Sequence, residues 1–171
     1  VTAGTNSTIL GGTGNNHDAG TQNLIGGGST NHVTTGTNSS ILGGSANTHA
    51  AGSQNLIGGG ASNTVTNGTN STILGGLSNT HSAGTENLIG GGTTNTISAG
   101  NYSSIVGGQG NTHTAGTHDV IGGGQSNTIT AGTHNFIGGG FTNSIDNGAH
   151  NFIGSGTLNS IGNANDATIG G

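Results

Sequence analysis

Isoleucine recurs at every sixteenth position along the whole chain, and this is the strongest apolar pattern in the sequence. The series consists of Ile9, Ile25, Ile41, Ile57, Ile73, Ile89, Ile105, Ile121, Ile137, Ile153 and Ile169. A fixed period of this kind is typical of a solenoid, in which each repeat buries its apolar residues against its neighbours. We therefore expect a single solenoid domain over residues 1–171, with about eleven coils of sixteen residues.

When columns are counted from each isoleucine as zero, column six is asparagine in all ten complete repeats. These residues are Asn15, Asn31, Asn47, Asn63, Asn79, Asn95, Asn111, Asn127, Asn143 and Asn159. Column eight alternates between histidine and a β-branched residue and later becomes isoleucine: His17, Val33, His49, Val65, His81, Ile97, His113, Ile129, Ile145 and Ile161. Glycine fills column three and nearly all of columns two and eleven, and column fourteen is mostly Asn or Ser. The repeat thus divides into two similar octads.

Each octad predicts one short strand around its apolar centre and one turn with glycine at positive φ. Two strands and two turns per coil make a parallel, two-sheet β-roll, which is an all-β fold. Because side chains alternate along a strand, we expect columns fourteen, zero and two to face inward from one sheet. Columns six, eight and ten face inward from the other. Coils stack about 4.8 Å apart, so the asparagines are expected to form a hydrogen-bonded ladder that also caps the turns.

Large apolar residues adjoin the isoleucines with a second rhythm of 32 residues. They are Leu10, Leu24, Leu42, Leu56, Leu74 and Leu88, followed by Phe136 and Phe152 in consecutive repeats. Next to an inward isoleucine they must point outward, so they predict a staggered apolar stripe on one sheet. A contiguous exposed stripe of this kind is typical of an interface. We expect lateral packing with other copies of the chain, as an oligomer or a filament.

Hydroxyl residues occupy columns seven and nine on five consecutive coils. The threonines are Thr64, Thr66, Thr80, Thr96, Thr112, Thr114, Thr128 and Thr130, and Ser82 and Ser98 complete the pairs. Both columns flank an inward residue, so the pairs form a regular outward grid on one flat sheet. Such a grid is suited to ordering water. The simpler interpretation, which we favour from the sequence, is that threonine suits strands and solvent and forms cross-strand ladders.

Two sets of histidines are candidate metal ligands. His17, His49, His81 and His113 are two coils apart, about 9.6 Å, which is too far for one metal ion within a chain. We interpret them as neutral histidines that form hydrogen bonds in a narrow core. His118, His134 and His150 follow each other in column thirteen, with Asp119 nearby. They are the best metal-like cluster, but we favour the interpretation that they form a solvated surface column.

Composition limits the functions that remain. The chain has no Lys or Arg, and charged residues make up only 3%. Neutralisation of phosphates is therefore excluded, and with it binding to nucleic acids and to anionic membranes. No apolar run is long enough for membrane insertion. No nucleophile, base and acid are spaced as a catalytic site, so we expect no enzyme activity and no cofactor or metal. The sequence begins and ends in mid-repeat without caps, which predicts a processed protein or a window of a longer array.

Three repeat families are similar in sequence. Asn95-Thr96-Ile97-Ser98-Ala99-Gly100 and residues Asn127 to Gly140 resemble the heads of trimeric autotransporter adhesins. That resemblance implies a left-handed β-roll that assembles as a trimer on bacterial surfaces. The Asn-x-Val/Ile pattern resembles the ryegrass antifreeze β-roll, which shares an inner Asn ladder. Residues Ser71 to Glu86 resemble the sixteen-residue bacterial ice-nucleation repeat, with Leu77 in its tyrosine column.

These observations favour a non-enzymatic structural protein outside the cell or on its surface. The leading hypothesis is a self-assembling fibre or an adhesin-like repeat, in which copies of the chain are the partners. The alternative is ice binding through the threonine grid, in which case ice is the partner.

Overall fold

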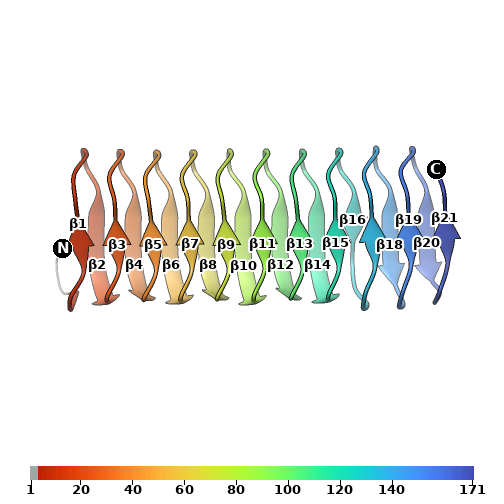
Figure 1. The fold of residues 1–171 in the computed structure, drawn as a ribbon, viewed down its shortest axis with the longest axis horizontal. Coiled ribbons are helices and arrows are strands. Elements are labelled where there is room, and N and C mark those ends of the chain that lie inside the picture. Colours follow the sequence, from red (N-terminus) through yellow and green to blue (C-terminus); the bar gives the residue numbers. More distant parts are fainter. Residues whose placement is uncertain (1–3) are drawn as a thin grey trace.

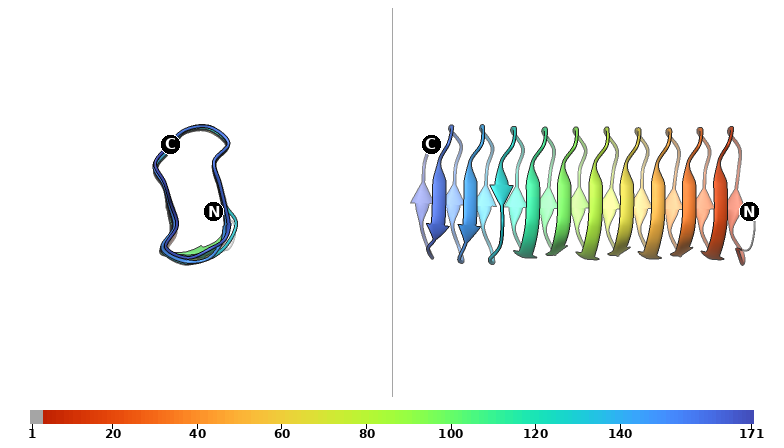
Figure 2. Two further views of the ribbon diagram at one scale, coloured as in Figure 1. Left: turned by 90° about the vertical axis from the view of Figure 1, so that its right-hand side faces the viewer. Right: turned by 180° about the vertical axis from the view of Figure 1, so that it is seen from behind.

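The computed structural model describes residues 4–171, which form one long rod of stacked coils (Figure 1). The first three residues lie outside the described part, among them Val1, at which the sequence begins in mid-repeat. The strands form two sheets, one with eleven strands and one with ten, and every pairing is parallel. Seen end-on, the coils superimpose as a flattened loop (Figure 2). The predicted two-sheet β-solenoid is therefore confirmed.

The strands of the eleven-stranded sheet are all two residues long and end at the isoleucine column. They are β1 (Thr8–Ile9), β3 (Leu24–Ile25), β5 (Ser40–Ile41), β7 (Leu56–Ile57), β9 (Thr72–Ile73), β11 (Leu88–Ile89), β13 (Ser104–Ile105), β15 (Val120–Ile121), β17 (Phe136–Ile137), β19 (Phe152–Ile153) and β21 (Thr168–Ile169).

The strands of the ten-stranded sheet surround column eight, and most of them are longer. They are β2 (Asn16–Thr21), β4 (His32–Thr37), β6 (Thr48–Ser53), β8 (Thr64–Thr69), β10 (Thr80–Thr85), β12 (Thr96–Asn101), β14 (Thr112–Thr117), β16 (Thr128–Ile129), β18 (Ser144–Asn147) and β20 (Ser160–Asn163). The two octads are thus alike in sequence but unequal in strand length.

Strand pairing shows that sixteen residues make one physical coil. Ile9 pairs with Ile25 in one sheet and His81 pairs with Ile97 in the other, in each case sixteen positions apart. The 32-residue rhythm therefore modulates neighbouring coils and does not define a larger one. In Figure 1 the front strands run upward and the rear strands run downward as the chain advances from N to C, so the solenoid is left-handed.

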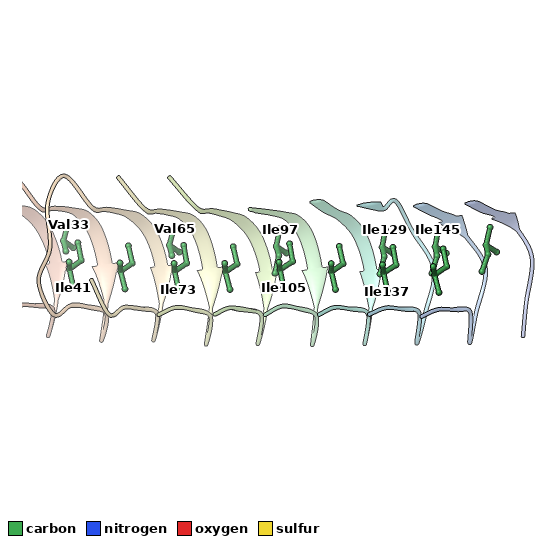
Figure 3. Close-up of a cluster of buried hydrophobic side chains, with 14 of the residues drawn as sticks. Val33, Ile41, Val65, Ile73, Ile97, Ile105, Ile129, Ile137 and Ile145 are labelled. Atoms are coloured by element: carbon green, nitrogen blue, oxygen red, sulfur yellow. The ribbon is translucent and has the colours of Figure 1, made fainter. Parts of the chain in front are cut away.

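The core is a single layer in which the isoleucine column meets column eight from the opposite sheet. In Figure 3, Val33 lies beside Ile41 and Ile97 lies beside Ile105. The isoleucines of column zero between the first and last coils are fully buried, whereas Ile9 is only partly buried. Each coil thus adds an isoleucine from one wall and a Val, Ile or His from the other, and the core continues only because coils stack.

The expected inward positions at columns two and ten are wrong. A Cβ added to Gly59 in column two would meet nothing within 4 Å, which places this column on the outside. The short strand ends at the isoleucine, so strict alternation stops there and the chain turns. In column ten, Ala83 is only half-buried, because the ladder pairs His81 and Ala83 but skips the residue between them. This break shifts the alternation, and in the coil of Val65 it is Gly68 in column eleven that is buried, while Asn67 in column ten is exposed.

The asparagines of column six form the predicted ladder, and each amide bonds to backbone groups. The Nδ2 of Asn79 donates to the carbonyls of Gly75, at 2.9 Å, and Gly92, at 3.0 Å. Its Oδ1 accepts the backbone N–H of Asn95 at 2.9 Å. The side chain of Asn79 therefore links its own turn to the next coil through both the amide nitrogen and the amide oxygen.

A second ladder runs through column fourteen, where Asn and Ser alternate. The Oδ1 of Asn87 accepts the backbone N–H of Ser103 at 3.0 Å. The Oγ of Ser71 in turn accepts the backbone N–H of Asn87 at 3.3 Å. At both turns, side-chain oxygens thus accept hydrogen bonds from buried backbone N–H groups of the following coil. Buried amide groups need such partners.

The residues of columns five and thirteen adopt a left-handed backbone conformation that could not be predicted from their residue types. Thr94 has φ of 55° and Tyr102 has φ of 53°, although neither residue type favours this region. Hydrogen bonds between coils hold both, because Thr94 N–H donates to Leu77 O and Tyr102 N–H donates to Thr85 O. Stacking therefore stabilises turns that an isolated repeat would not form.

We predict that Asn79→Ala lowers the free energy of unfolding by about 3 kcal/mol. The substitution leaves two carbonyls and one buried N–H without their bonds, and each such loss costs roughly 1–3 kcal/mol when the group stays buried. Urea denaturation measures the change. Asn67→Ala is the matched control, because Asn67 is exposed and alanine fills its column in neighbouring coils. Equal losses in the two variants would contradict a structural role for the ladder.

Candidate functional site

The rod offers surfaces rather than a pocket for function. Residues 4–171 enclose no detectable pocket. Within the same range, no three His, Cys, Asp or Glu side chains are arranged to hold a metal ion. None of the described residues forms a helix capable of crossing a membrane. Candidate sites are therefore the outer faces of the two sheets, the buried histidines between them and the turns.

The outer face of the eleven-stranded sheet carries the apolar stripe. Its members in columns one and fifteen are Leu10, Leu24, Leu42, Leu56, Leu74, Leu88, Val106, Val120, Phe136 and Phe152. Leu42 and Leu74 expose 51% and 54% of their surface, while Leu56 is half-buried among its neighbours. Val106 and Val120 occupy the same two columns as the leucines and belong to the stripe, although the apolar residues expected at the interface did not include them. The stripe is continuous from the first coil to Phe152.

Aromatic rings extend the stripe toward its C-terminal end. Phe136 and Phe152 stack with ring centroids 5.4 Å apart and an interplanar angle of 6°. The acidic residues of the chain lie in other columns; they are Asp18, Glu86, Asp119, Asp146 and Asp166. No charge therefore interrupts this face, and burying it against an apolar surface requires no desolvation of an ion.

The outer face of the ten-stranded sheet carries the hydroxyl grid. The strands align Thr80, Thr96 and Thr112 in neighbouring positions, and Thr64 and Thr128 continue the row on either side. The second row, in column nine, is the more exposed one. Within residues 4–171, none of the eight threonine hydroxyls of the grid makes a hydrogen bond to another side chain or to the backbone. The hydroxyls are thus free to bond to water.

The first histidine set lies in the core and alternates with β-branched residues. His17, His49, His81 and His113 are each about 1% exposed. The Asn87 Nδ2 lies 3.0 Å from His81 Nε2 and also donates to Gly100 O at 2.6 Å. Because Asn87 Nδ2 is a donor, His81 Nε2 accepts and the ring proton is on Nδ1. The Nδ1 atom has no hydrogen-bond partner among the described residues.

Glycine in the preceding coil makes room for each ring. A Cβ on Gly68 would lie 2.6 Å from the Cε1 of His81, so any side chain there would collide with the imidazole. Burial lowers the pKa of His49 and of His81 from 6.5 to about 4. Burial is also the main cause of the lowered pKa of His17. These histidines are therefore neutral at physiological pH.

His113 has a different partner. Its Nε2 lies 3.0 Å from the Oδ2 of Asp119, which takes the place that Asn87 has beside His81. A carboxylate accepts hydrogen bonds, so here Nε2 must donate. Asp119 is buried and its Oδ1 also accepts the backbone N–H of Asn135 at 2.8 Å. Asp119 therefore belongs to the core. The sequence suggested instead that it lies with the column of His118.

The second histidine set forms an exposed stack at one turn of the rod. The rings of Tyr102, His118, His134 and His150 follow one another with centroid distances of 5.0, 4.8 and 5.3 Å. All four residues have positive φ, which aligns the rings along the axis. Parallel stacked rings do not direct their nitrogen lone pairs at a common point. This geometry favours the solvated surface column over the metal site.

No protein-family model matches the chain, and a search of curated proteins finds no match. The two faces of the rod differ sharply in chemistry. One face is apolar and uncharged, and the other presents ordered hydroxyls.

We predict that the solenoid loses stability as the pH falls from about 6.5 toward 4. In this window the unfolded chain binds a proton at each histidine, whereas folded His49 and His81 stay neutral down to about pH 4. Between pH 8 and pH 5 each of the two costs about 2 kcal/mol of unfolding free energy. Urea denaturation at a series of pH values measures the loss.

His81→Ile is the matched variant for this test. Isoleucine fills the same column at Ile129, where the column-fourteen partner Asn135 is an asparagine like Asn87. The variant is expected to fold and to lose about 2 kcal/mol less than the wild type between pH 8 and pH 5. The same pH dependence in both proteins would show that the buried histidines do not cause it.

Proposed function

We propose that the protein is a non-enzymatic structural protein that works outside the cell and assembles with copies of itself. The observation that carries the proposal is the uncharged apolar stripe along the whole eleven-stranded sheet. Contiguous apolar surface of this extent is typical of interaction sites in soluble proteins. On a rod with a core only one layer deep, burying the stripe adds a second apolar layer to each coil.

The remaining features support a durable extracellular material. The chain contains no Lys or Arg, so it presents no cleavage site to trypsin-like proteases. Its left-handed winding supports the resemblance to adhesin heads, which have the same hand (Figures 1 and 2). Both the fibre and the adhesin-like reading use a rod that displays its faces and needs no cavity.

Self-association of the purified protein tests the proposal. Sedimentation velocity over a range of concentrations is expected to show oligomers, and electron microscopy is expected to show paired or bundled rods. The triple variant Leu42→Asn, Leu74→Asn, Val106→Asn is expected to sediment as a monomer. Its control is Leu77→Asn with Leu158→Asn, since both leucines are exposed but lie outside the stripe. A wild type that stays monomeric at high concentration would overturn the proposal.

Ice binding is the second candidate, because the hydroxyl grid favours it specifically. In column seven, threonine repeats about every 4.8 Å along the rod, and parallel pairing aligns this row over five coils from Thr64 to Thr128. Column nine adds a second row of Thr and Ser that the strand pairing skips. The described residues make no hydrogen bond to the threonine hydroxyls of either row. Methyl and hydroxyl groups at such fixed spacing are able to order a layer of water.

A thermal-hysteresis and ice-recrystallisation assay tests this candidate. The wild type is expected to inhibit ice growth, and Thr96→Tyr, Thr112→Tyr and Thr128→Tyr together are expected to abolish the effect by breaking the flat lattice. Thr13→Tyr with Thr157→Tyr is the control, because these exposed threonines lie in a turn outside the grid. Wild-type protein without either activity would eliminate ice binding.

A further inference from the structure

In every coil from β1 to β19, one of the two neighbours of the isoleucine is a bulky apolar residue and the other is a small residue. In order, the residue pairs before and after the isoleucine are Thr8 and Leu10, Leu24 and Gly26, Ser40 and Leu42, Leu56 and Gly58, Thr72 and Leu74, Leu88 and Gly90, Ser104 and Val106, Val120 and Gly122, Phe136 and Gly138, and Phe152 and Gly154. Neither two bulky nor two small residues occur in any of these ten coils. Stacking explains the glycines, because a Cβ on Gly26 would lie 2.5 Å from the carbonyl oxygen of Leu42 in the next coil, but it does not account for the bulky residue on the other side of the isoleucine.

This alternation of bulky and small residues allows two copies of the chain to pack face to face. Consider a two-fold axis that runs along the rod between two eleven-stranded sheets. The rods then point the same way, while the facing strands run in opposite directions. Column fifteen of one copy lies opposite column one of the same coil in the other copy. Ser40 thus faces the partner's Leu42, and Leu56 faces the partner's Gly58.

We propose that the stripe is the interface of a parallel, in-register pair of this chain, in which each bulky residue lies opposite a small one. Every level of the interface then contains two bulky and two small side chains, so the sheets stay equally far apart along the rod. This inference rests on the proposed self-assembly and specifies its partner and geometry. At the C-terminal end the Cε1 of Phe136 lies 3.3 Å from the position of a Cβ on its own Gly138, so glycine there leaves room for a ring.

Other arrangements of the two rods break this match. A shift by one coil places Leu24 opposite Leu42, which is bulky against bulky. An antiparallel pair places column fifteen opposite column fifteen, so that the consecutive bulky residues Val120, Phe136 and Phe152 face alternating Leu and Ser or Thr. Only the parallel arrangement without a shift pairs large with small in all ten coils.

The size and charge of the stripe fit a second copy as its occupant. Ten coils at about 4.8 Å and a width of about 12 Å give roughly 600 Å² per chain, or about 1,200 Å² in total, which reaches the lower range of specific interfaces. The stripe contains no charged residue, so identical faces do not repel each other. The bulky side chains repeat about every 4.8 Å along the rod, and a second copy presents the same spacing.

A swap of the large and small residues in one coil tests the pairing. Ser40→Leu adds apolar surface but places a leucine opposite the partner's Leu42. Overpacking at two symmetric positions is expected to weaken dimerisation by roughly tenfold or more. The double variant Ser40→Leu, Leu42→Ser restores one bulky and one small residue in the coil and is expected to recover the wild-type dissociation constant. Sedimentation equilibrium measures all three proteins, with circular dichroism to verify the fold.

Each outcome decides a different question. If the wild type is monomeric, the proposed self-assembly fails and the pairing fails with it. If the wild type associates but Ser40→Leu strengthens association, apolar area alone drives it and the pairing is wrong. A trimer as the end state likewise contradicts a two-fold interface, even though self-assembly stands.

Cross-linking tests the register independently, because the native chain has no cysteine. Ser40→Cys protein mixed with Leu42→Cys protein is expected to give heterodimers with a short bis-maleimide that spans the separation of about 10 Å between packed sheets. Ser40→Cys mixed with Val106→Cys is the control and is expected to give none. Equal yields in the two mixtures would rule out the in-register arrangement.

Discussion

The structure depends on the bonds that the buried asparagines make to the backbone of the next coil. A single-layer core leaves the turns close to the interior, and there the backbone N–H and carbonyl groups need partners. Asn79 makes three of these bonds by itself. At the opposite turn, Ser71 and Asn87 each accept a backbone N–H of the next coil. Such a side chain fits only if coils repeat at the same rise. The sixteen-residue period is therefore a bonding requirement as much as a packing one.

In the first coils, the core and the outer stripe change together every 32 residues. Where an Asn in column fourteen bonds to a histidine in column eight, the residue before the isoleucine is leucine, as in His81, Asn87 and Leu88. Where column fourteen is Ser, the core residue is Val or Ile and the bulky outer residue follows the isoleucine. After Ile121 this link ends, because Asn135 and Asn151 share their coils with Ile129 and Ile145 in column eight.

Much of this was predictable from the sequence, because strict columns fix both the coil length and the buried residues. The Ile column, the Asn ladder and the outward leucines follow from periodicity alone. Positions that depend on local bends did not follow. Gly59 faces outward and Ala83 is only half-buried, since strand alternation ends after two residues in one sheet and breaks at column nine in the other. The left-handed φ of Tyr102 and the pairing of Asp119 with His113 depend on contacts between coils that no single repeat reveals.

The rod has one apolar face and one hydroxyl face, and we propose that another copy of the chain covers the apolar face. Small-angle X-ray scattering of the native protein tests this most directly, through the mass per unit length of the rod. A single solenoid has sixteen residues for every 4.8 Å or so of length. Paired rods are expected to show about twice that value with an unchanged length for the pair. A value that stays at that of one solenoid at every concentration would contradict the account.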